Sequence, residues 1–446
     1  MLFLEIIILF LFCEAFYLKN ATINLMKQPY IWDNYSDQPY PLKDKAYKKI
    51  KRRENLTSIL KTIIISLFVF PISLIMIPFV KNKKIDTSSF FCLGVDYQRE
   101  PSETLKLVKE LGVKHILIRL KLWEIDTLDN LKEFILNFQD EKITLKIMQD
   151  RENVESLELF RNNLELIFSK LGNKVDIYEI GTTINRAKWG FFSVDEYNAF
   201  FKTAYDLKEQ KHPELKLIGS GVIDFEYHFT THTLFNFFKY KYDGISALLY
   251  VDRRGAPENM QLGFNASDKI ALLSTMVWLS PKTKHELYLT EINWPISNTA
   301  PYAPTSEKEC IDLESYANYM LRYYLLALAS QQVDALSWHQ LVAPGYGLVD
   351  NRDSIKKYPA FKTYKTMIKN LKNTQFLRLD INRQHYIFQC LVDEELLQIH
   401  WSLKPTTIHK ENNFDVYSKD GEKIEDQTLQ IGPSPIYVYI KTKTRT

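Results

Sequence analysis

The segment most informative about the fold is His285–Pro295, HELYLTEINWP. Because side chains on a strand alternate with a period of two, Leu287, Leu289 and Glu291 share one face of an expected strand. The strand ends where Glu291 is followed closely by Trp294 and a turn-forming proline. A carboxylate at the open end of a strand, beside an aromatic ring, is typical of a sugar-processing site. Taken alone, these residues also fit a glutamate that caps a turn, so the place of this strand in the fold decides its meaning.

From Phe90 onward, apolar and β-branched runs alternate with segments of helical periodicity, which predicts βα units and a parallel sheet. One expected helix, Ser193–Gln210, begins with a capping box formed by Ser193 and Glu196. Eight such units predict a (β/α)8 barrel, whose functional sites lie at the C-terminal ends of the strands. Glu291 then ends the seventh strand. The expected strands are Phe90–Tyr97, His115–Leu120, Ile143–Gln149, Val175–Gly181, Leu215–Ile223, Gly244–Val251, Glu286–Ile292 and Asp334–Gln340.

After Thr374 the pattern changes to short strands separated by turn residues. We therefore expect three parts: a barrel over residues 86–373, an all-β domain of sandwich type over 374–446, and an N-terminal part over 1–85. The expected role of the all-β domain is structural, and sugar binding is the less favoured alternative.

The N-terminal part contains an apolar segment, Thr62–Val80, of nineteen residues without a charge. A helix of this length can cross a hydrocarbon core of about 30 Å, so we predict a membrane span. Met1–Tyr17 is also apolar, but it contains Glu5 and Glu14 and lacks a basic leading region, which argues against a signal peptide. We interpret it as a possible first span.

A basic run, Lys43–Glu54, lies between the two apolar segments. The positive-inside rule then keeps this loop in the cytoplasm and predicts that the large domain after residue 81 is extracytoplasmic. The basic residues of Lys81–Lys84 leave the opposite orientation open. The basic run also suits contact with anionic head groups, although a solvated charged face explains it equally well.

The composition excludes several classes of function. Net charge is +3 and 25% of residues are charged, so nothing indicates a nucleic-acid partner. The four cysteines are widely separated and predict neither a disulfide framework nor a zinc site. Since no phosphate loop or metal-ligand spacing occurs, no cofactor is expected.

Several motifs in order along the barrel resemble the clan A glycoside hydrolases, most closely the β-xylosidase and α-L-iduronidase family and its exopolysaccharide-processing relatives. They are EIGTTIN at 179–185, LTEINWP at 289–295, SWHQL at 337–341, KKYPAF at 356–361 and GPSPIYV at 432–438. The resemblance implies a retaining enzyme with two carboxyl groups about 5–5.5 Å apart. It assigns the role of nucleophile to Glu291.

The same resemblance identifies a missing group. The family pattern E-x-G-N-E-P-N places its acid/base glutamate where this chain has Thr183, and its sugar-binding asparagine where this chain has Thr182. Threonine has no proton to donate near neutral pH. Glu179 is expected about 13 Å deeper in the barrel, because each strand residue advances about 3.3 Å. We consider Glu226 and Asp252 as substitute acids, although each also fits a simple loop carboxylate.

Other side chains expected at the open end have binding roles. Arg119 would keep Glu291 ionised through charge-assisted hydrogen bonds, and Tyr250 would donate to the second oxygen of Glu291. Trp338 would present a flat apolar face for a pyranose. A structural ion pair or a core position is the alternative for each. Further lining candidates are Asn185, Trp294, Trp189, Asp96 and His228.

Two hypotheses follow for function. The first is a membrane-anchored glycoside hydrolase that acts on an envelope polysaccharide or glycolipid through Glu291. The second is a catalytically impaired homologue that binds glycan during polysaccharide assembly or export. The loss of the acid/base favours the second hypothesis, whereas Glu291, Arg119 and the aromatic residues favour the first.

Overall fold

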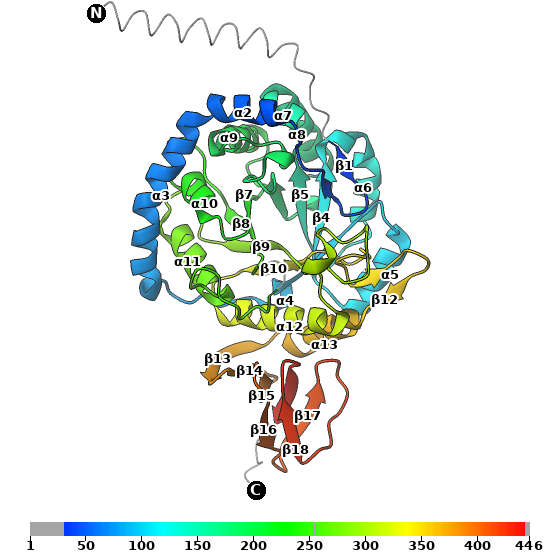
Figure 1. The fold of residues 1–446 in the computed structure, drawn as a ribbon. Coiled ribbons are helices and arrows are strands. Elements are labelled where there is room, and N and C mark those ends of the chain that lie inside the picture. The colour runs from blue at the N-terminus through cyan, green and yellow to red at the C-terminus, as the bar shows by residue number, and fades with distance from the viewer. Residues whose placement is uncertain (1–30, 253–254, 442–446) are drawn as a thin grey trace, which may run out of the picture.

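The eight predicted strands all form and close into a parallel barrel (Figure 1). The computed structural model describes residues 31–252 and 255–441. Neighbouring strands follow chain order around the barrel, and the last strand pairs with the first. The barrel strands are β3 (Phe91–Val95), β4 (His115–Lys121), β5 (Lys142–Met148), β6 (Ile177–Ile180), β7 (Leu217–Ile223), β8 (Gly244–Leu248), β9 (Leu287–Ile292) and β10 (Ala335–Trp338).

Helices surround this barrel, as the alternating periodicity predicts. Ser193 caps α9 by accepting a hydrogen bond from the Glu196 amide at 3.2 Å. Helix α5 begins at Pro101, whose ring suits the first helical position, and Glu100 precedes it. The principal helices are α5 (Pro101–Leu111), α6 (Leu128–Ile135), α8 (Leu157–Leu171), α9 (Val194–Lys211), α10 (Tyr227–Leu234), α11 (Ala266–Leu279), α12 (Leu313–Ala329) and α13 (Pro359–Leu371).

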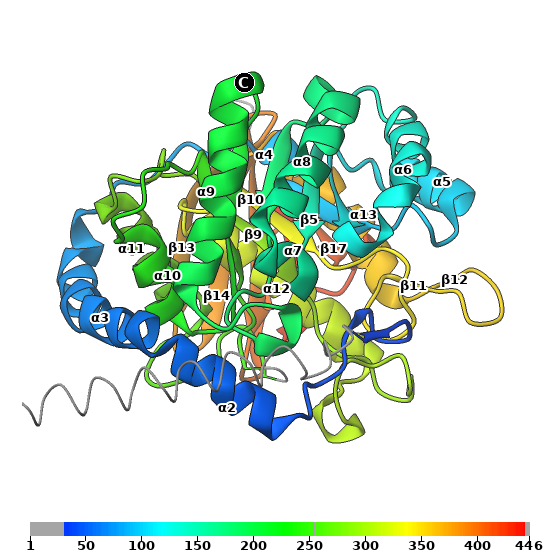
Figure 2. The same ribbon diagram turned by 90° about the horizontal axis from the view of Figure 1, so that it is seen from above.

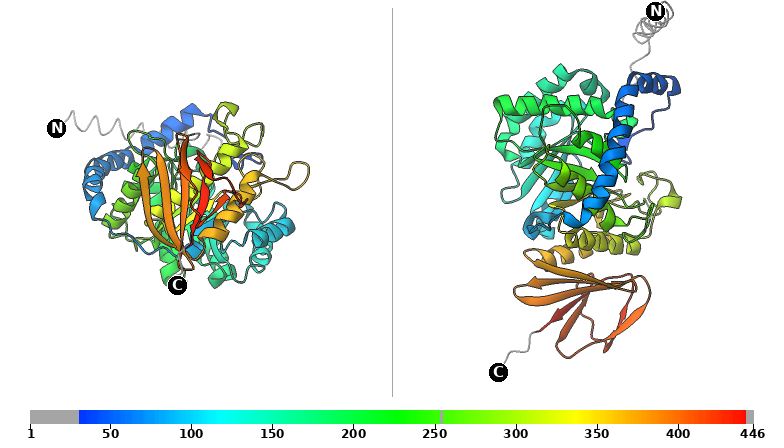
Figure 3. Two further views of the ribbon diagram at one scale, coloured as in Figure 1. Left: turned by 90° about the horizontal axis from the view of Figure 1, so that it is seen from below. Right: turned by 90° about the vertical axis from the view of Figure 1, so that its left-hand side faces the viewer.

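The N-terminal region from residue 31 packs against the barrel. A short hairpin, β1 (Trp32–Asp33) and β2 (Gln38–Pro39), lies over the mouth, which is the end where the strands terminate. Next, α2 (Lys45–Glu54) passes across the same end (Figure 2). The long helix α3 (Leu56–Met76) then runs along the outside of the barrel against α10 and α11 (Figure 3, right).

Among the described residues, one helical stretch, Leu56–Phe79, is long and apolar enough to cross a membrane. It contains most of the predicted span, but it begins six residues earlier than predicted. Pro71 lies inside the helix. Membrane crossing remains a prediction, and the possible span at residues 1–17 lies outside the described residues.

The C-terminal part consists of antiparallel sheets, one of five strands in the order β13-β14-β15-β19-β17 and one formed by β16 and β18. Apolar side chains of both sheets, including Val416, Leu429 and Val438, share a small core. This part lies beneath α12 and α13, away from the mouth (Figures 1 and 3). Its strands are β13 (Gln375–Asn382), β14 (His385–Val392), β15 (Glu395–Ser402), β16 (Thr406–His409), β17 (Phe414–Ser418), β18 (Thr428–Ile431) and β19 (Ile436–Ile440).

Candidate active site

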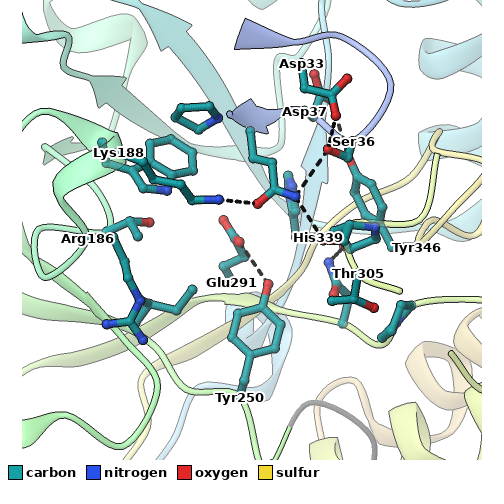
Figure 4. Close-up of a pocket in the computed structure, with 18 of the residues that line it drawn as sticks. Asp33, Ser36, Asp37, Arg186, Lys188, Tyr250, Glu291, Thr305, His339 and Tyr346 are labelled. Carbon is teal, nitrogen blue, oxygen red and sulfur yellow. Dashed lines mark hydrogen bonds between the residues drawn. The ribbon is translucent and has the colours of Figure 1, made fainter. Parts of the chain in front are cut away.

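A pocket of about 550 Å³ opens at the mouth of the barrel, with Glu291 at its base (Figure 4). Its walls come from the β1–β2 hairpin, from Arg119 on β4, and from the ends of β7 and β9 and the segments that follow β6, β7, β8, β9 and β10. Sites of (β/α)8 barrels are built from the C-terminal ends of their strands, and this pocket has that location.

Glu291 is held in one orientation. The Tyr250 hydroxyl donates a hydrogen bond to Glu291 Oε1 at 2.8 Å, so the sequence correctly paired these two side chains. Lys146 Nζ lies 3.6 Å from Glu291 Oε2. The relative solvent exposure of the Glu291 side chain is 17%, so a molecule in the pocket can reach it.

The surroundings favour the carboxylate form of Glu291. Burial acts to raise its pKa, but the charges of His339, Lys146 and Arg119 and the Tyr250 hydrogen bond lower the pKa below its ordinary value. Burial lowers the pKa of His339 itself to about 3, so this ring is neutral near pH 7. Near pH 7 the charges of Lys146 and Arg119 therefore act on Glu291. Burial raises the pKa of Tyr250, which keeps its hydroxyl protonated as a donor.

Beneath Glu291 lies a second buried carboxyl group, Glu179. Lys146 Nζ lies 3.4 Å from Glu179 Oε2 and so bridges the two carboxyl groups. Thr290 Oγ1 donates to Glu179 Oε1 at 2.8 Å. Burial raises the pKa of Glu179. Glu179 is fully buried and outside the pocket lining, as its expected depth implied.

Thr183 lines the pocket. Its φ of 50° lies in the left-handed region, which is uncommon for a β-branched residue. Thr182, its neighbour, is buried with Oγ1 3.3 Å from Thr183 Oγ1 and lies outside the lining. The position that the resemblance assigns to the acid/base therefore faces the pocket, while the neighbouring position does not.

The two expected substitute acids do not reach the pocket lining. Glu226 accepts hydrogen bonds from Arg186 at 2.7 Å and from Asn185 at 2.8 Å, and neither Glu226 nor Asn185 lines the pocket. Asp252 also lies outside the lining. Asp224, which the sequence analysis did not select, does line the pocket, and it accepts from Arg186 at 2.6 Å.

Arg119 has a different partner from the one expected. Its guanidinium donates to Asp37 Oδ2 of the hairpin at 3.0 Å, and it acts on Glu291 through its charge instead of a hydrogen bond. Asp37 also lies 3.4 Å from Arg99 and accepts from Gln340 at 3.1 Å. These positive charges outweigh burial and lower the pKa of Asp37 to about 2.

The expected stacking platform is absent at Trp338. This side chain and Trp294 are both buried, and their rings stack on each other with centroids 6.1 Å apart. Trp294 Nε1 also donates to the Gly255 carbonyl at 3.1 Å. Both indoles therefore belong to the packed interior, where tyrosines of α12 pack against them: Tyr316 against Trp338, and Tyr323 against Trp294. The aromatic side chains that line the pocket are Tyr40, Trp189, Tyr250 and Tyr346.

The other lining candidates lie in different places. Trp189 lines the pocket, whereas His228 lies in a separate groove beside α3 and Asp96 in a small cavity near Arg119. Within the described ranges, no cluster of His, Cys, Asp and Glu side chains suits a metal ion.

Sequence reasoning missed the residues that reach the pocket from a distance. Lys146 carries a recognisable signal, because a lysine inside the apolar strand ITLKIM must find a carboxylate when buried. Asp37, by contrast, lies in a polar stretch without any local pattern. His339 and Tyr346 also line the pocket without having been selected.

The fold is similar to that of several solved structures, although no sequence match was found. No protein-family model matches the chain, and no curated protein matches it by sequence. Among solved structures, it is similar to a family 39 glycoside hydrolase of Bacteroides cellulosilyticus, with a TM-score of 0.59 and 15% identity over 80% of this chain and 82% of that one.

Two further solved structures have a similar fold. A family 39 β-xylosidase of Caulobacter crescentus has a TM-score of 0.55 and 12% identity, covering 81% of this chain and 98% of that one. A family 30 endoxylanase of Clostridium papyrosolvens has a TM-score of 0.54 and 9% identity, with coverage of 81% and 97%. The chain thus has the barrel fold of clan A glycoside hydrolases, which confirms the resemblance at the level of fold.

Proposed function

We propose that this protein is a retaining glycoside hydrolase that binds carbohydrate at the barrel mouth and uses Glu291 as its nucleophile. One observation carries the proposal: Glu291 is an accessible carboxylate at the base of a pocket, held by Tyr250 and kept ionised by Lys146 and Arg119. Attack on an anomeric carbon requires this combination of access, orientation and charge.

The resemblance also explains which substrates to test. By that resemblance Thr183 stands at the acid/base position, so no glutamate there protonates the leaving group. Hydrolysis is then expected first for glycosides whose leaving groups depart as anions. A general acid contributes about 10²–10⁴-fold in rate, and unactivated glycosides should be slower by that order.

The decisive experiment uses the full chain, because the hairpin supplies part of the pocket. Turnover of a panel of 2,4-dinitrophenyl glycosides is measured for the wild type and for Glu291→Gln. We expect the substitution to lower turnover by about 10³-fold or more, the scale on which loss of a catalytic nucleophile acts. Turnover that Glu291→Gln leaves unchanged would refute the assignment.

Restoring an acid provides a matched pair of variants. Thr183→Glu places a carboxyl group on a wall of the pocket and should raise turnover of alkyl glycosides by about 10²-fold. Thr182→Glu adds the same group one residue away, outside the lining, and should give no gain. Equal effects of the two variants would contradict the proposed place of the acid/base.

A second candidate function has one observation in its favour, the threonine at position 183. A barrel without an acid/base can bind glycan without cleaving it, as in polysaccharide assembly or export. For this function, a glycan array should detect binding that Glu291→Gln preserves, together with no turnover of any activated glycoside.

Attachment to a membrane is part of the proposal. The apolar helix α3 and the basic helix α2 support it. We propose an extracytoplasmic location next to the envelope, where a polysaccharide or glycolipid is the substrate. A reporter fused after Thr446 that proves to be cytoplasmic would overturn this orientation.

A further inference from the structure

Helix α3 packs on the barrel through three buried polar side chains and a few partly buried apolar ones. Ser58, Thr62 and Ser73 are the buried residues of this helix. Thr62 Oγ1 lies 2.7 Å from His232 Nδ1, and Ser66 Oγ lies 2.8 Å from Thr231 Oγ1, both within hydrogen-bonding distance on α10. A helix at the surface of a protein normally turns its apolar face inward. On α3, by contrast, the fully buried residues are polar, and the apolar side chains that touch the barrel core, such as Val69 and Phe70, are only partly buried.

The outer face of α3 is consequently apolar. Leu67 is 69% exposed and Ile75 is 70% exposed. Since the exposed apolar residues recur at helical spacing, they form one continuous stripe, and an exposed apolar surface of this kind marks a protein or membrane contact. The stripe comprises Leu56, Leu60, Ile63, Ile64, Leu67, Phe68, Ile72, Leu74, Ile75 and Phe79.

Both ends of α3 are attached to the same barrel. Near the start, Lys61 Nζ lies 2.9 Å from Asp195. Just after the end, Lys83 Nζ lies 2.7 Å from Asp334 Oδ2, at the opposite end of the barrel from the mouth. A spanning helix separates its two ends by a hydrocarbon core of about 30 Å. The contacts at one end or the other would then have to be broken.

The basic helix α2 lies next to the apolar stripe, and Ile63 of the stripe lines the same groove as the α2 cations. Its side chains Lys45, Lys48, Lys49 and Arg52 line one wall of a groove of about 790 Å³. Among the described residues, none of these four cations forms an ion pair. The other walls are partly apolar and include Ile59, Ile63, Phe191, Phe192 and Phe229. Apolar walls beside a row of cations suit an anionic lipid, whose head group is charged and whose chains are apolar.

We propose that α2 and α3 form a membrane-docking surface that lies in the plane of one leaflet of an anionic bilayer, so that α3 does not cross it. The stripe on α3 inserts among the acyl chains, and the α2 cations contact the head groups. A symmetric dimer through this face would bring two basic rows together, which like charge opposes. The inference rests on the membrane attachment proposed above and not on the chemistry of Glu291. It replaces crossing by α3, so α2 and the barrel lie on the same side of the membrane, and the positive-inside rule applied across α3 no longer bears on which side that is.

Docking in this way orients the barrel. The groove and the Glu291 pocket lie on either side of the segment 183–189, which contributes residues to both. The mouth therefore opens close to the head groups. A glycan that is attached to a lipid, or that lies against the leaflet, then has the shortest path to Glu291.

The first test measures sidedness in the full chain. Lys45→Cys and Lys84→Cys are made separately in a chain with Cys13 and Cys310 replaced by serine, since Cys92 and Cys390 are buried. The protein is reconstituted in sealed vesicles of phosphatidylethanolamine and phosphatidylglycerol, and an impermeant maleimide is added. In-plane docking predicts that the reagent labels both positions from the same side. Labelling from opposite sides would overturn the proposal.

The second test measures depth. A nitrobenzoxadiazole probe is attached at Leu60, Leu67 or Ile75 through cysteine and is quenched by lipids that carry spin labels at different depths. In-plane docking predicts one shallow depth for all three positions. Deep burial of Leu67 between two shallow ends would instead show a span. Exposed Leu136 and Leu166 on other helices are matched controls, and quenching there equal to that on α3 would overturn the proposed surface.

The third test addresses the head groups. With the probe at Leu67, the triple change Lys48→Glu, Lys49→Glu and Arg52→Glu should weaken lipid contact with phosphatidylglycerol vesicles by roughly 100-fold and have little effect with phosphatidylcholine. An unchanged signal in anionic vesicles would overturn the role of α2. Glu291→Gln should leave all three readouts unaltered, so a failure here is distinct from a failure of the proposed chemistry.

Discussion

Lys146 is the cation that connects the two carboxyl groups of the site. Its ammonium group is almost fully buried and lies within 3.6 Å of both Glu179 and Glu291. An isolated buried charge is costly, so the lysine and the two carboxyl groups depend on one another. Because burial raises the pKa of Glu179 whereas the pKa of Glu291 is lowered, the negative charge is concentrated on the carboxylate that faces the pocket.

Lys146→Met is predicted to shift the pH profile of turnover. Removing the positive charge raises the pKa of Glu291, so its carboxylate forms only at higher pH. The acidic limb of activity on dinitrophenyl glycosides should then move upward by about one pH unit or more. Lys142→Met is the matched control, since Lys142 begins the same strand at the far end from Glu291. An unmoved acidic limb in Lys146→Met would contradict the assignment.

At the scale of elements, the β1–β2 hairpin is the part of the site that comes from outside the barrel. Asp37 has a φ of 52° and is buried among groups from β4 and from the segments after β3 and β10. Gln38 links the hairpin to two loops, donating to the Pro304 carbonyl at 3.0 Å and accepting from Lys188 at 2.6 Å. The hairpin therefore forms one wall of the pocket and keeps Arg119 in place.

Asp37→Asn is predicted to loosen the hairpin. The amide cannot balance Arg119 and Arg99, and breaking a buried ion pair costs about 3 kcal/mol. Hydrogen exchange reports this locally, because the Tyr40 amide donates to the Ile31 carbonyl within the hairpin at 2.9 Å. Its protection should fall by about 100-fold at pH 7. Asp33→Asn, in the same hairpin and less buried, should cause a much smaller loss.

The pH dependence of that protection has a definite sign. The pKa of Asp37 is lowered to about 2 from an ordinary value of 3.8. A lowered pKa means that the ionised group stabilises the folded hairpin above pH 4 and that this contribution is lost as the pH falls toward 2. Wild-type protection, corrected for intrinsic exchange, should decline over this range, whereas Asp37→Asn should show no such decline.

In the whole molecule, the barrel and the C-terminal sheets share an apolar core, and one buried carboxylate, Glu258, links them within it. Glu258 accepts from Arg322 of α12 at 2.7 Å and from Trp401 of β15 at 2.8 Å. Arg322 also donates to the Pro433 carbonyl at 3.0 Å. No described residue of the C-terminal sheets lines the Glu291 pocket, so these sheets support the barrel without reaching Glu291.

Glu258→Gln is predicted to destabilise the molecule by about 3 kcal/mol, because it leaves the Arg322 guanidinium buried without a counter-charge. The measurement is urea unfolding followed by circular dichroism. Glu314→Gln is the matched control: Glu314 pairs with Lys419 across the same interface, but its side chain is 60% exposed. An exposed pair contributes less than about 1 kcal/mol. Equal losses in the two variants would show that burial does not govern this joint.

The barrel and the position of Glu291 follow from local patterns in the sequence. Periodicity is a local property, so each strand and helix could be read from its own residues, and βα units follow one another around a barrel in chain order. Counting to the seventh strand therefore located Glu291 at the mouth. The contact of Tyr250 with Glu291 could be predicted in the same way, because Tyr250 comes just after the sixth strand and hence lies next to the end of the seventh.

The groups that surround Glu291 are brought together by contacts between distant parts of the chain, which the sequence pattern does not show. Asp37 meets Arg119 across 82 residues and Gln340 across 303, and no local pattern encodes such a contact. Trp338 is on the expected strand, but neighbouring segments cover it, so its burial depends on packing that periodicity does not describe. The same holds for α3: its composition marks a membrane segment, whereas the attachment of both its ends to the barrel comes from contacts with residues far along the chain.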